Sequence, residues 1–103
     1  MMQFNSKVIF KLTILICVFY INIGEANPAE ILYKQGFSLS IEGKTQSAIQ
    51  AYLKALEIKP DYAEAHHSLG VLYFETDNGA KAIDHFKKAE LFYKNRKDEK
   101  ANL

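Results

Sequence analysis

Apolar residues between positions 29 and 93 recur at the three- and four-residue spacing of helices that bury one face. Three interruptions divide this pattern, because glycine, proline and short polar residues favour turns. They are Gly43, the pair Pro60-Asp61, and the run Asp77-Asn78-Gly79. The pattern therefore predicts an all-α chain of four helices, at residues 28–41, 45–58, 62–75 and 80–93.

Two of the predicted helix starts carry capping signals. Before the first helix, Asn27 can cap the backbone, Pro28 suits the first helical position, and Glu30 can reach back toward the cap. Before the third helix, Asp61 and Glu64 resemble a capping box. Both signals follow a break in the apolar pattern, so they support the predicted boundaries.

A displacement of 34 residues aligns the second helix pair with the first. Glycine falls on glycine, alanine on alanine and aromatic on aromatic at four pairs: Gly36 and Gly70, Ala48 and Ala82, Tyr52 and Phe86, Ala55 and Ala89. Small residues let two helices approach closely, and a large residue beside them fills the remaining space. One helix-turn-helix unit is therefore expected twice, at residues 29–62 and 63–96.

A unit of this period resembles the tetratricopeptide repeat. The second copy supplies the residues of the family pattern at Leu69, Gly70, Tyr73, Ala82, Phe86 and Ala89, and the first at Gly36, Ala48, Tyr52, Ala55 and Pro60. The resemblance implies an all-α fold in which two repeats form a short right-handed α-solenoid. It also implies that the protein binds another protein and is not an enzyme.

In this family the first helix of each repeat lines a concave groove. The resemblance places six residues there: Tyr33, Phe37, Ile41, His67, Val71 and Phe74. Such an apolar surface suits a partner's amphipathic helix or apolar segment. Alternatively, these residues are buried against each other or by a neighbouring subunit. Some family members clamp a C-terminal carboxylate with Lys and Asn, but Lys34 and Lys44 have no groove Asn beside them.

The adjacent histidines His66 and His67 are candidates for a metal or catalytic site. Neighbouring residues on a helix point about 100° apart, so the two rings diverge. The helical motif that binds zinc spaces its histidines four apart and adds a glutamate. We therefore expect His66 to pack against the second helix of its own repeat and His67 to line the groove. No metal, cofactor or catalytic residue is predicted.

Residues 1–26 differ in composition from the rest of the chain. A start that carries Lys7 and Lys11 precedes the uncharged apolar run 12–23, and the small residues of Gly24-Glu25-Ala26 follow. This order is typical of a secretory signal peptide, cleaved here after Ala26. The apolar run is short for a membrane span, which needs about 20 residues. An uncleaved N-terminal membrane anchor is the alternative.

Both alternatives export residues 27–103, to the periplasm or the outside, because basic residues before an apolar segment favour the cytoplasmic side. The only cysteine, Cys17, lies in the apolar run, so no disulfide is expected in the exported part. Without Lys7, Lys11 and Glu25, the 13 basic and 12 acidic residues become 11 of each. This balance does not favour a nucleic-acid partner. Membrane contact is expected only if residues 1–26 stay attached.

After the second repeat only a short polar tail, residues 97–103, is expected, too few residues for a covering helix. Solenoid repeats bury their faces against neighbours, so the last helix is expected to leave an apolar edge. Its residues are Ile83, Leu91, Phe92 and Tyr93. A second copy of the protein, as a homodimer, or a partner's helix could cover this edge. The alternative function is thus a membrane-tethered assembly factor that docks through it.

Overall fold

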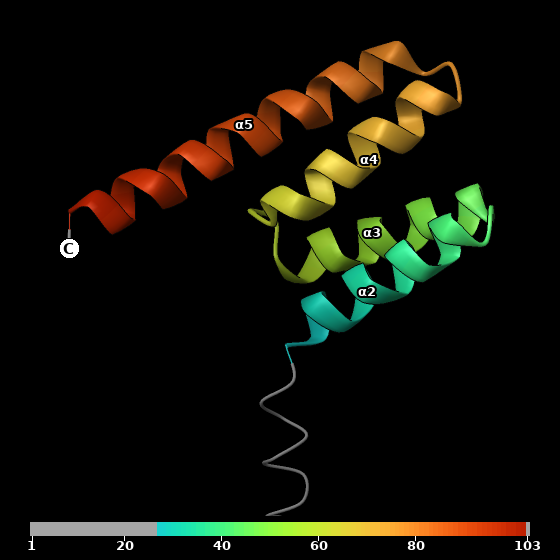
Figure 1. Ribbon diagram of the computed structural model, residues 1–103, viewed down its shortest axis with the longest axis horizontal. Coiled ribbons are helices and arrows are strands. Elements are labelled where there is room, and N and C mark those ends of the chain that lie inside the picture. Colours follow the sequence, from blue (N-terminus) through green and yellow to red (C-terminus); the bar gives the residue numbers. More distant parts are fainter. Residues whose placement is uncertain (1–26, 103) are drawn as a thin grey trace, which may run out of the picture.

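The structure is a computed structural model that describes residues 27–102. The predicted signal peptide or anchor lies outside the described residues. Within them the chain is helical with short turns and contains no strand: α2 (Pro28–Ile41), α3 (Thr45–Ile58), α4 (Ala63–Glu75) and α5 (Gly79–Ala101) (Figure 1). None of these four helices combines the length and the apolar character that a membrane crossing requires. The predicted all-α class is confirmed.

The first two helices have the predicted bounds, and local chemistry explains them. The side chain of Asn27 accepts a hydrogen bond from the backbone N–H of Ala29 at 3.0 Å, which caps α2. Glu30 does not reach back to the cap; it pairs with Lys34 at 3.1 Å. In the turn after α2, Gly43 has φ of +77°, a conformation that glycine adopts without a steric penalty.

The predicted capping box before α4 is wrong. The cap residue is Tyr62, and no side chain makes a capping hydrogen bond there. A capping box needs its two side chains at the cap and three residues later, and Asp61 and Glu64 each stand one residue too early. The carboxylate of Glu64 instead accepts two hydrogen bonds from the guanidinium of Arg96, at 2.6 and 3.1 Å.

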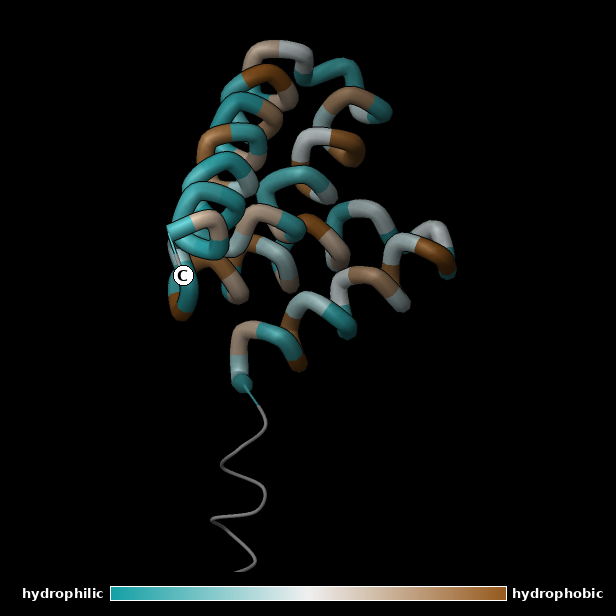
Figure 2. Tube along the Cα trace, turned by 60° about the vertical axis from the view of Figure 1, so that its left-hand side comes forward, coloured by the Kyte–Doolittle hydropathy of each residue, from teal (hydrophilic) through white to brown (hydrophobic). Residues whose placement is uncertain are grey.

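The fourth helix is longer than predicted. It was expected to end near Tyr93, but α5 continues to Ala101, so residues 97–101 of the expected tail are helical. The stretch after Tyr93 has no glycine or proline to stop the helix, and its lysines, arginine and glutamate favour helix. Figure 2 shows that this C-terminal half of α5 is mostly hydrophilic, and Figure 1 shows it extending past the start of α4.

The helices form two antiparallel hairpins, α2 with α3 and α4 with α5, and the hairpins stack through α3 and α4 (Figure 1). The glycines act as the 34-residue repeat predicts. A Cβ atom on Gly36 would lie 2.9 Å from the ring of Tyr52, and one on Gly70 would lie 2.6 Å from the ring of Phe86. Because real Cβ atoms avoid such distances, each aromatic ring occupies space that only glycine leaves free.

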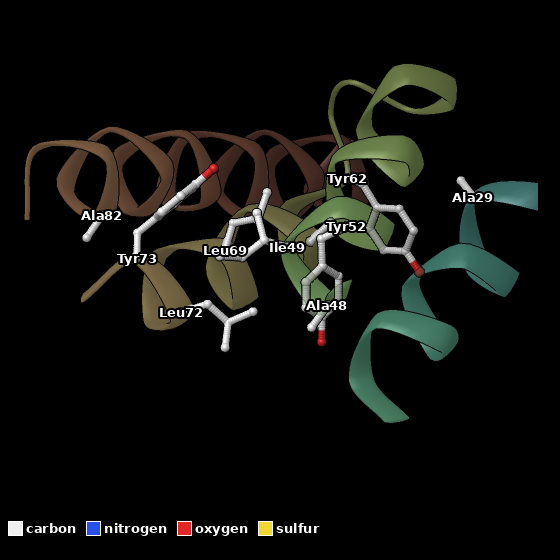
Figure 3. Packing of buried hydrophobic residues seen from close by; sticks show 10 residues of the cluster. Ala29, Ala48, Ile49, Tyr52, Tyr62, Leu69, Leu72, Tyr73 and Ala82 are labelled. Carbon is white, nitrogen blue, oxygen red and sulfur yellow. The ribbon is translucent and has the colours of Figure 1, made fainter. Parts of the chain in front are cut away.

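The buried core lies inside the two hairpins and along the α3–α4 contact that joins them. Tyr52 and Leu69 are its largest fully buried side chains. Figure 3 shows them with their neighbours, which include Ala48 and Ile49 from α3 and Leu72 from α4. The alanines of the repeat pattern are also buried: Ala48, Ala55, Ala82 and Ala89. This packing holds α2 and α4 side by side, which positions the candidate site.

Candidate functional site

A shallow depression of about 180 Å³ lies between α2 and α4. It is lined by Phe37, Ser40, Tyr52, His67, Ser68, Val71 and Leu72. Three of the six predicted groove residues, Phe37, His67 and Val71, are therefore brought together. The side chains of Phe37 and Val71 are 53% and 39% exposed, although both are apolar. We call this depression and its lining residues the groove.

The other three predicted groove residues lie elsewhere. Tyr33 is half-buried, with its ring stacked on Tyr62 at 5.2 Å between centroids and tilted against Tyr52 at 5.5 Å. It therefore packs α2 against α3 and against the residue that caps α4. Ile41 and Phe74 do not line the groove, and both are 71% exposed. They extend the apolar surface beyond the groove, toward the C-terminal ends of α2 and α4.

Polar groups also line the groove, namely those of Tyr52, Ser40 and Ser68. Tyr52 is 1% exposed, and burial raises the pKa of its phenol, an effect that hydrogen bonding to Ser68 and Ser40 opposes. The Ser40 hydroxyl also donates to the Phe37 carbonyl at 2.8 Å. Each serine stands three residues from a predicted groove residue, a spacing that places it on the same helix face.

His66 is buried and packs against α5, as expected, and its partner there is His85. The Nε2 atom of His66 lies 2.8 Å from the Pro60 carbonyl oxygen, and its Nδ1 atom lies 3.0 Å from Nδ1 of His85. A carbonyl only accepts, so Nε2 carries the hydrogen. In the neutral ring Nδ1 of His66 is then an acceptor, and Nδ1–H of His85 donates to it.

The surroundings of His85 disfavour its charged form. Its ring stacks on His66 at 5.3 Å and on Tyr73 at 5.5 Å between centroids. Burial, followed by the nearby His66 and Lys88, lowers the pKa of the imidazole, and Asp84 acts weakly in the opposite direction. His85 is therefore held in its neutral form at neutral pH.

His67 points away from this pair, as the 100° rotation predicts. It is exposed and meets the ring of Phe86 edge-on, at 5.5 Å between centroids. Within the described residues, no three His, Cys, Asp or Glu side chains are grouped closely enough to hold a metal ion.

The predicted C-terminal edge is only partly apolar. Ile83, Leu91 and Tyr93 are exposed, but Phe92 is half-buried, with its ring 5.5 Å from that of His66. Phe92 lies two helical turns after His85, on the stripe of α5 that faces α4. It therefore belongs to the packing between α4 and α5.

The outer face of α5 is more polar than the matching face of α3. In α3 this face packs on the buried core, whereas in α5 two of three matching positions are charged. The matching pairs are Ile49 and Ile83, Leu53 and Lys87, and Leu56 and Glu90. The α5 edge thus lacks the continuous apolar stripe through which α3 holds the next repeat.

Residues 29–77 match the family model of the TPR repeat, the tetratricopeptide repeat. Two curated proteins, described as probable UDP-N-acetylglucosamine–peptide N-acetylglucosaminyltransferases SPINDLY, from Oryza sativa subsp. japonica and Hordeum vulgare, are each 40% identical over 63 residues. These residues are 61% of this chain and 7% of each relative.

Solved structures of MamA are similar as well. A crystal structure of MamA has a TM-score of 0.66 at 31% identity, over 68% of this chain and 41% of that one. A second, MamA MSR-1, has a TM-score of 0.63 at 26% identity, over 74% and 45%. The chain thus spans less than half of these relatives. The sequence match, the fold and the glycine–aromatic contact that recurs after 34 residues all agree. The chain is a tetratricopeptide-repeat protein, and its four described helices form two repeats.

Proposed function

We propose that this chain is a non-catalytic interaction module that binds a segment of a partner protein in the groove between α2 and α4. The observation that carries the proposal is the exposure of Phe37 and Val71, which line the groove from α2 and α4 respectively. Exposed apolar side chains that cluster around a depression are typical of docking sites. Tetratricopeptide repeats and the likeness to MamA support a protein-binding role.

The shape and chemistry of the groove favour a short partner segment. Its volume of about 180 Å³ is small, so it suits one or two apolar side chains. The hydroxyls of Ser40 and Ser68, which line the groove, offer hydrogen bonds to a segment that lies across α2 and α4. The SPINDLY relatives are described as transferases, but the likeness covers 7% of each, so we propose no transferase activity for this chain.

The place of action in this proposal is outside the cytoplasm. Its support is the order of basic start, apolar run 12–23 and small residues up to Ala26. Cleavage after Ala26 releases a soluble binder, whereas an intact N-terminus leaves the repeats tethered close to the membrane. Intact-mass measurement of the exported protein distinguishes the two, because a mass equal to the full chain contradicts cleavage.

The groove is tested by site-specific photo-crosslinking in cells that make the protein. A photoreactive residue at position 37 or 71 should cross-link to one and the same partner, identified by mass spectrometry. The matched control is position 83, which is 57% exposed on the outer face of α5. The double change Phe37→Glu and Val71→Glu should abolish the complex and leave the helical circular dichroism unchanged. If position 83 cross-links to a partner and positions 37 and 71 do not, groove binding is contradicted.

A second candidate function is docking through the edge of α5, as an assembly factor or a homodimer. The observation that favours it is the exposure of Ile83 and Leu91 on one helix. Light scattering of the full chain over a range of concentrations tests self-association, and the change of both residues to Lys should suppress it. A monomer at every concentration leaves only a partner protein to cover this edge.

A further inference from the structure

The groove has two unlike ends, because α2 and α4 run in the same direction. Each packs antiparallel to α3, so their C-terminal ends lie on the same side of the molecule (Figure 1). Helix C-termini carry a partial negative charge from their unpaired carbonyl groups and favour cations nearby. This end of the groove is therefore electrostatically negative before any side chain is considered.

The side chains strengthen this polarity. Phe37 and Val71 line the groove, and one turn further along each helix stand Ile41 and Glu75. On α4 the position after Val71 on this face is therefore a carboxylate, whereas on α2 the position after Phe37 is apolar. Asp77, in the turn after α4, adds a second carboxylate. Both acidic side chains are exposed.

Neither acid is held in an ion pair within the described part of the chain. No basic side chain there lies within 4.0 Å of the carboxylate of Glu75 or Asp77. Lys44, in the turn after α2, is paired with Glu42 at 2.9 Å. Lys34, on α2, is paired with Glu30 at 3.1 Å. Lys81, near the turn after α4, lies over the Tyr73 ring at 5.3 Å and lines a separate depression with Thr76 and Asn78. No lysine or arginine lines the groove itself, and two carboxylates against this one lysine leave a net negative charge at this end.

We propose that the segment bound in the groove carries a basic residue beside its apolar anchor, positioned over Glu75 and Asp77. This rests on the proposed function and names the chemistry of the partner. Val71 and Glu75 are one helical turn apart, about 6 Å along the axis. In a helical ligand, an apolar and a basic residue four positions apart match this spacing. In an extended ligand, the matching residues are two positions apart. An acidic or C-terminal carboxylate at this end is repelled.

Two synthetic helical peptides test the proposal on the full chain. Both contain the same apolar Leu/Ala stretch, and they differ only in two residues at one end, lysine in one and glutamate in the other. Fluorescence anisotropy measures their dissociation constants. Exposed charge pairs contribute modestly, so the lysine peptide should bind about three- to tenfold more tightly at low salt. The preference should vanish near 1 M salt, where the screening length is about 3 Å.

Variants assign the preference to the two acids. Glu75→Gln with Asp77→Asn should remove the preference without weakening the glutamate peptide; asparagine suits the positive φ of +59° at position 77. The matched control is Glu57→Gln on α3, an exposed acid outside the groove, which should leave the preference unchanged.

The outcomes separate this inference from the proposed function. If neither peptide binds, or if both still bind after Phe37→Glu, groove binding itself is wrong. If both bind equally tightly and Phe37→Glu abolishes both, the groove is a docking site and the basic-residue inference is wrong. A lysine preference that persists in the Glu75→Gln, Asp77→Asn variant also overturns the inference.

Discussion

Nδ1 of His66 lies 3.0 Å from Nδ1 of His85, a contact that requires one nitrogen with a hydrogen and one without. Partial burial of the His85 ring disfavours its charged form and lowers its pKa. The contact joins α4 to α5 inside the second repeat.

We expect the protein to lose stability as the pH falls below about 6.5, the ordinary value for histidine. The lowered pKa of His85 means that the unfolded chain binds more protons in this range, so acid favours unfolding. Hydrogen bonding to Arg96 also lowers the pKa of Glu64, but this shift affects stability only below about pH 4.5. Urea midpoints at pH 7.5 and 5.5 measure the loss.

The double variant His66→Leu, His85→Ala separates this pair from other groups. It installs the residues that the first repeat has at these positions, Leu32 and Ala51. The drop in midpoint between pH 7.5 and 5.5 should shrink in this variant and persist in the exposed control His67→Gln. An equal drop in all three proteins contradicts the role of the pair.

Gly70→Leu should destabilise the second repeat, because even a Cβ at this position would lie 2.6 Å from the Phe86 ring. Overpacking of this kind typically costs about 1–3 kcal/mol, more than the roughly 1 kcal/mol gained when glycine is replaced in a helix. Thermal unfolding measures the effect. The control is Gly79→Ala, which meets no atom within 4 Å and should be neutral or stabilising. A Gly70→Leu protein that melts with the wild type contradicts the close packing.

Phe92→Ala should cost more stability than Leu91→Ala, although both residues are large and adjacent. Phe92 packs on His66, whereas the Leu91 side chain is 52% exposed. Truncation of a fully buried phenylalanine costs about 3–5 kcal/mol, so a half-buried one should lose roughly half of that, and Leu91 less than about 1 kcal/mol. Chemical denaturation of the two variants compares them directly. The reverse order is expected if Phe92 faces outward on the edge.

Arg96→Ala should loosen the end of α5 with little effect on global stability. The Glu64–Arg96 pair is bidentate, but its side chains are 33% and 38% exposed, so solvent screening leaves it about 0.2–1 kcal/mol. Hydrogen exchange should quicken in residues 93–101 and remain unchanged in α2 and α3. The exposed Lys97, which makes no ion pair within the described residues, supplies the control Lys97→Ala.

Helix boundaries were predictable where a local signal sets them. Gly43 and Pro60 end the first two helices because their backbones cannot continue a helix without cost, and both predicted ends are confirmed. The end of α5 was missed, because no breaker follows Tyr93 and the helix continues through residues of good propensity.

The site was only partly predictable, because its neighbours come from different helices. The helical period places Phe37 and Val71 on one side, and the structure brings them together. The same period cannot show that Tyr33 stacks on Tyr62, since that contact depends on how the hairpins stack. The pairing of His66 with His85 escaped prediction for the same reason, since the two residues are 19 positions apart in sequence.

The packing of each helix mainly on its neighbour in sequence also governs how the chain reaches its native state. Contacts between consecutive helices close short loops, so little chain entropy is lost before each contact forms, and proteins of this kind fold in microseconds to milliseconds. Either hairpin can serve as the nucleus, because each has its own glycine–aromatic contact. The order of events should therefore be set by relative hairpin stability, and a mutation such as Gly36→Leu should redirect folding to begin at α4 and α5.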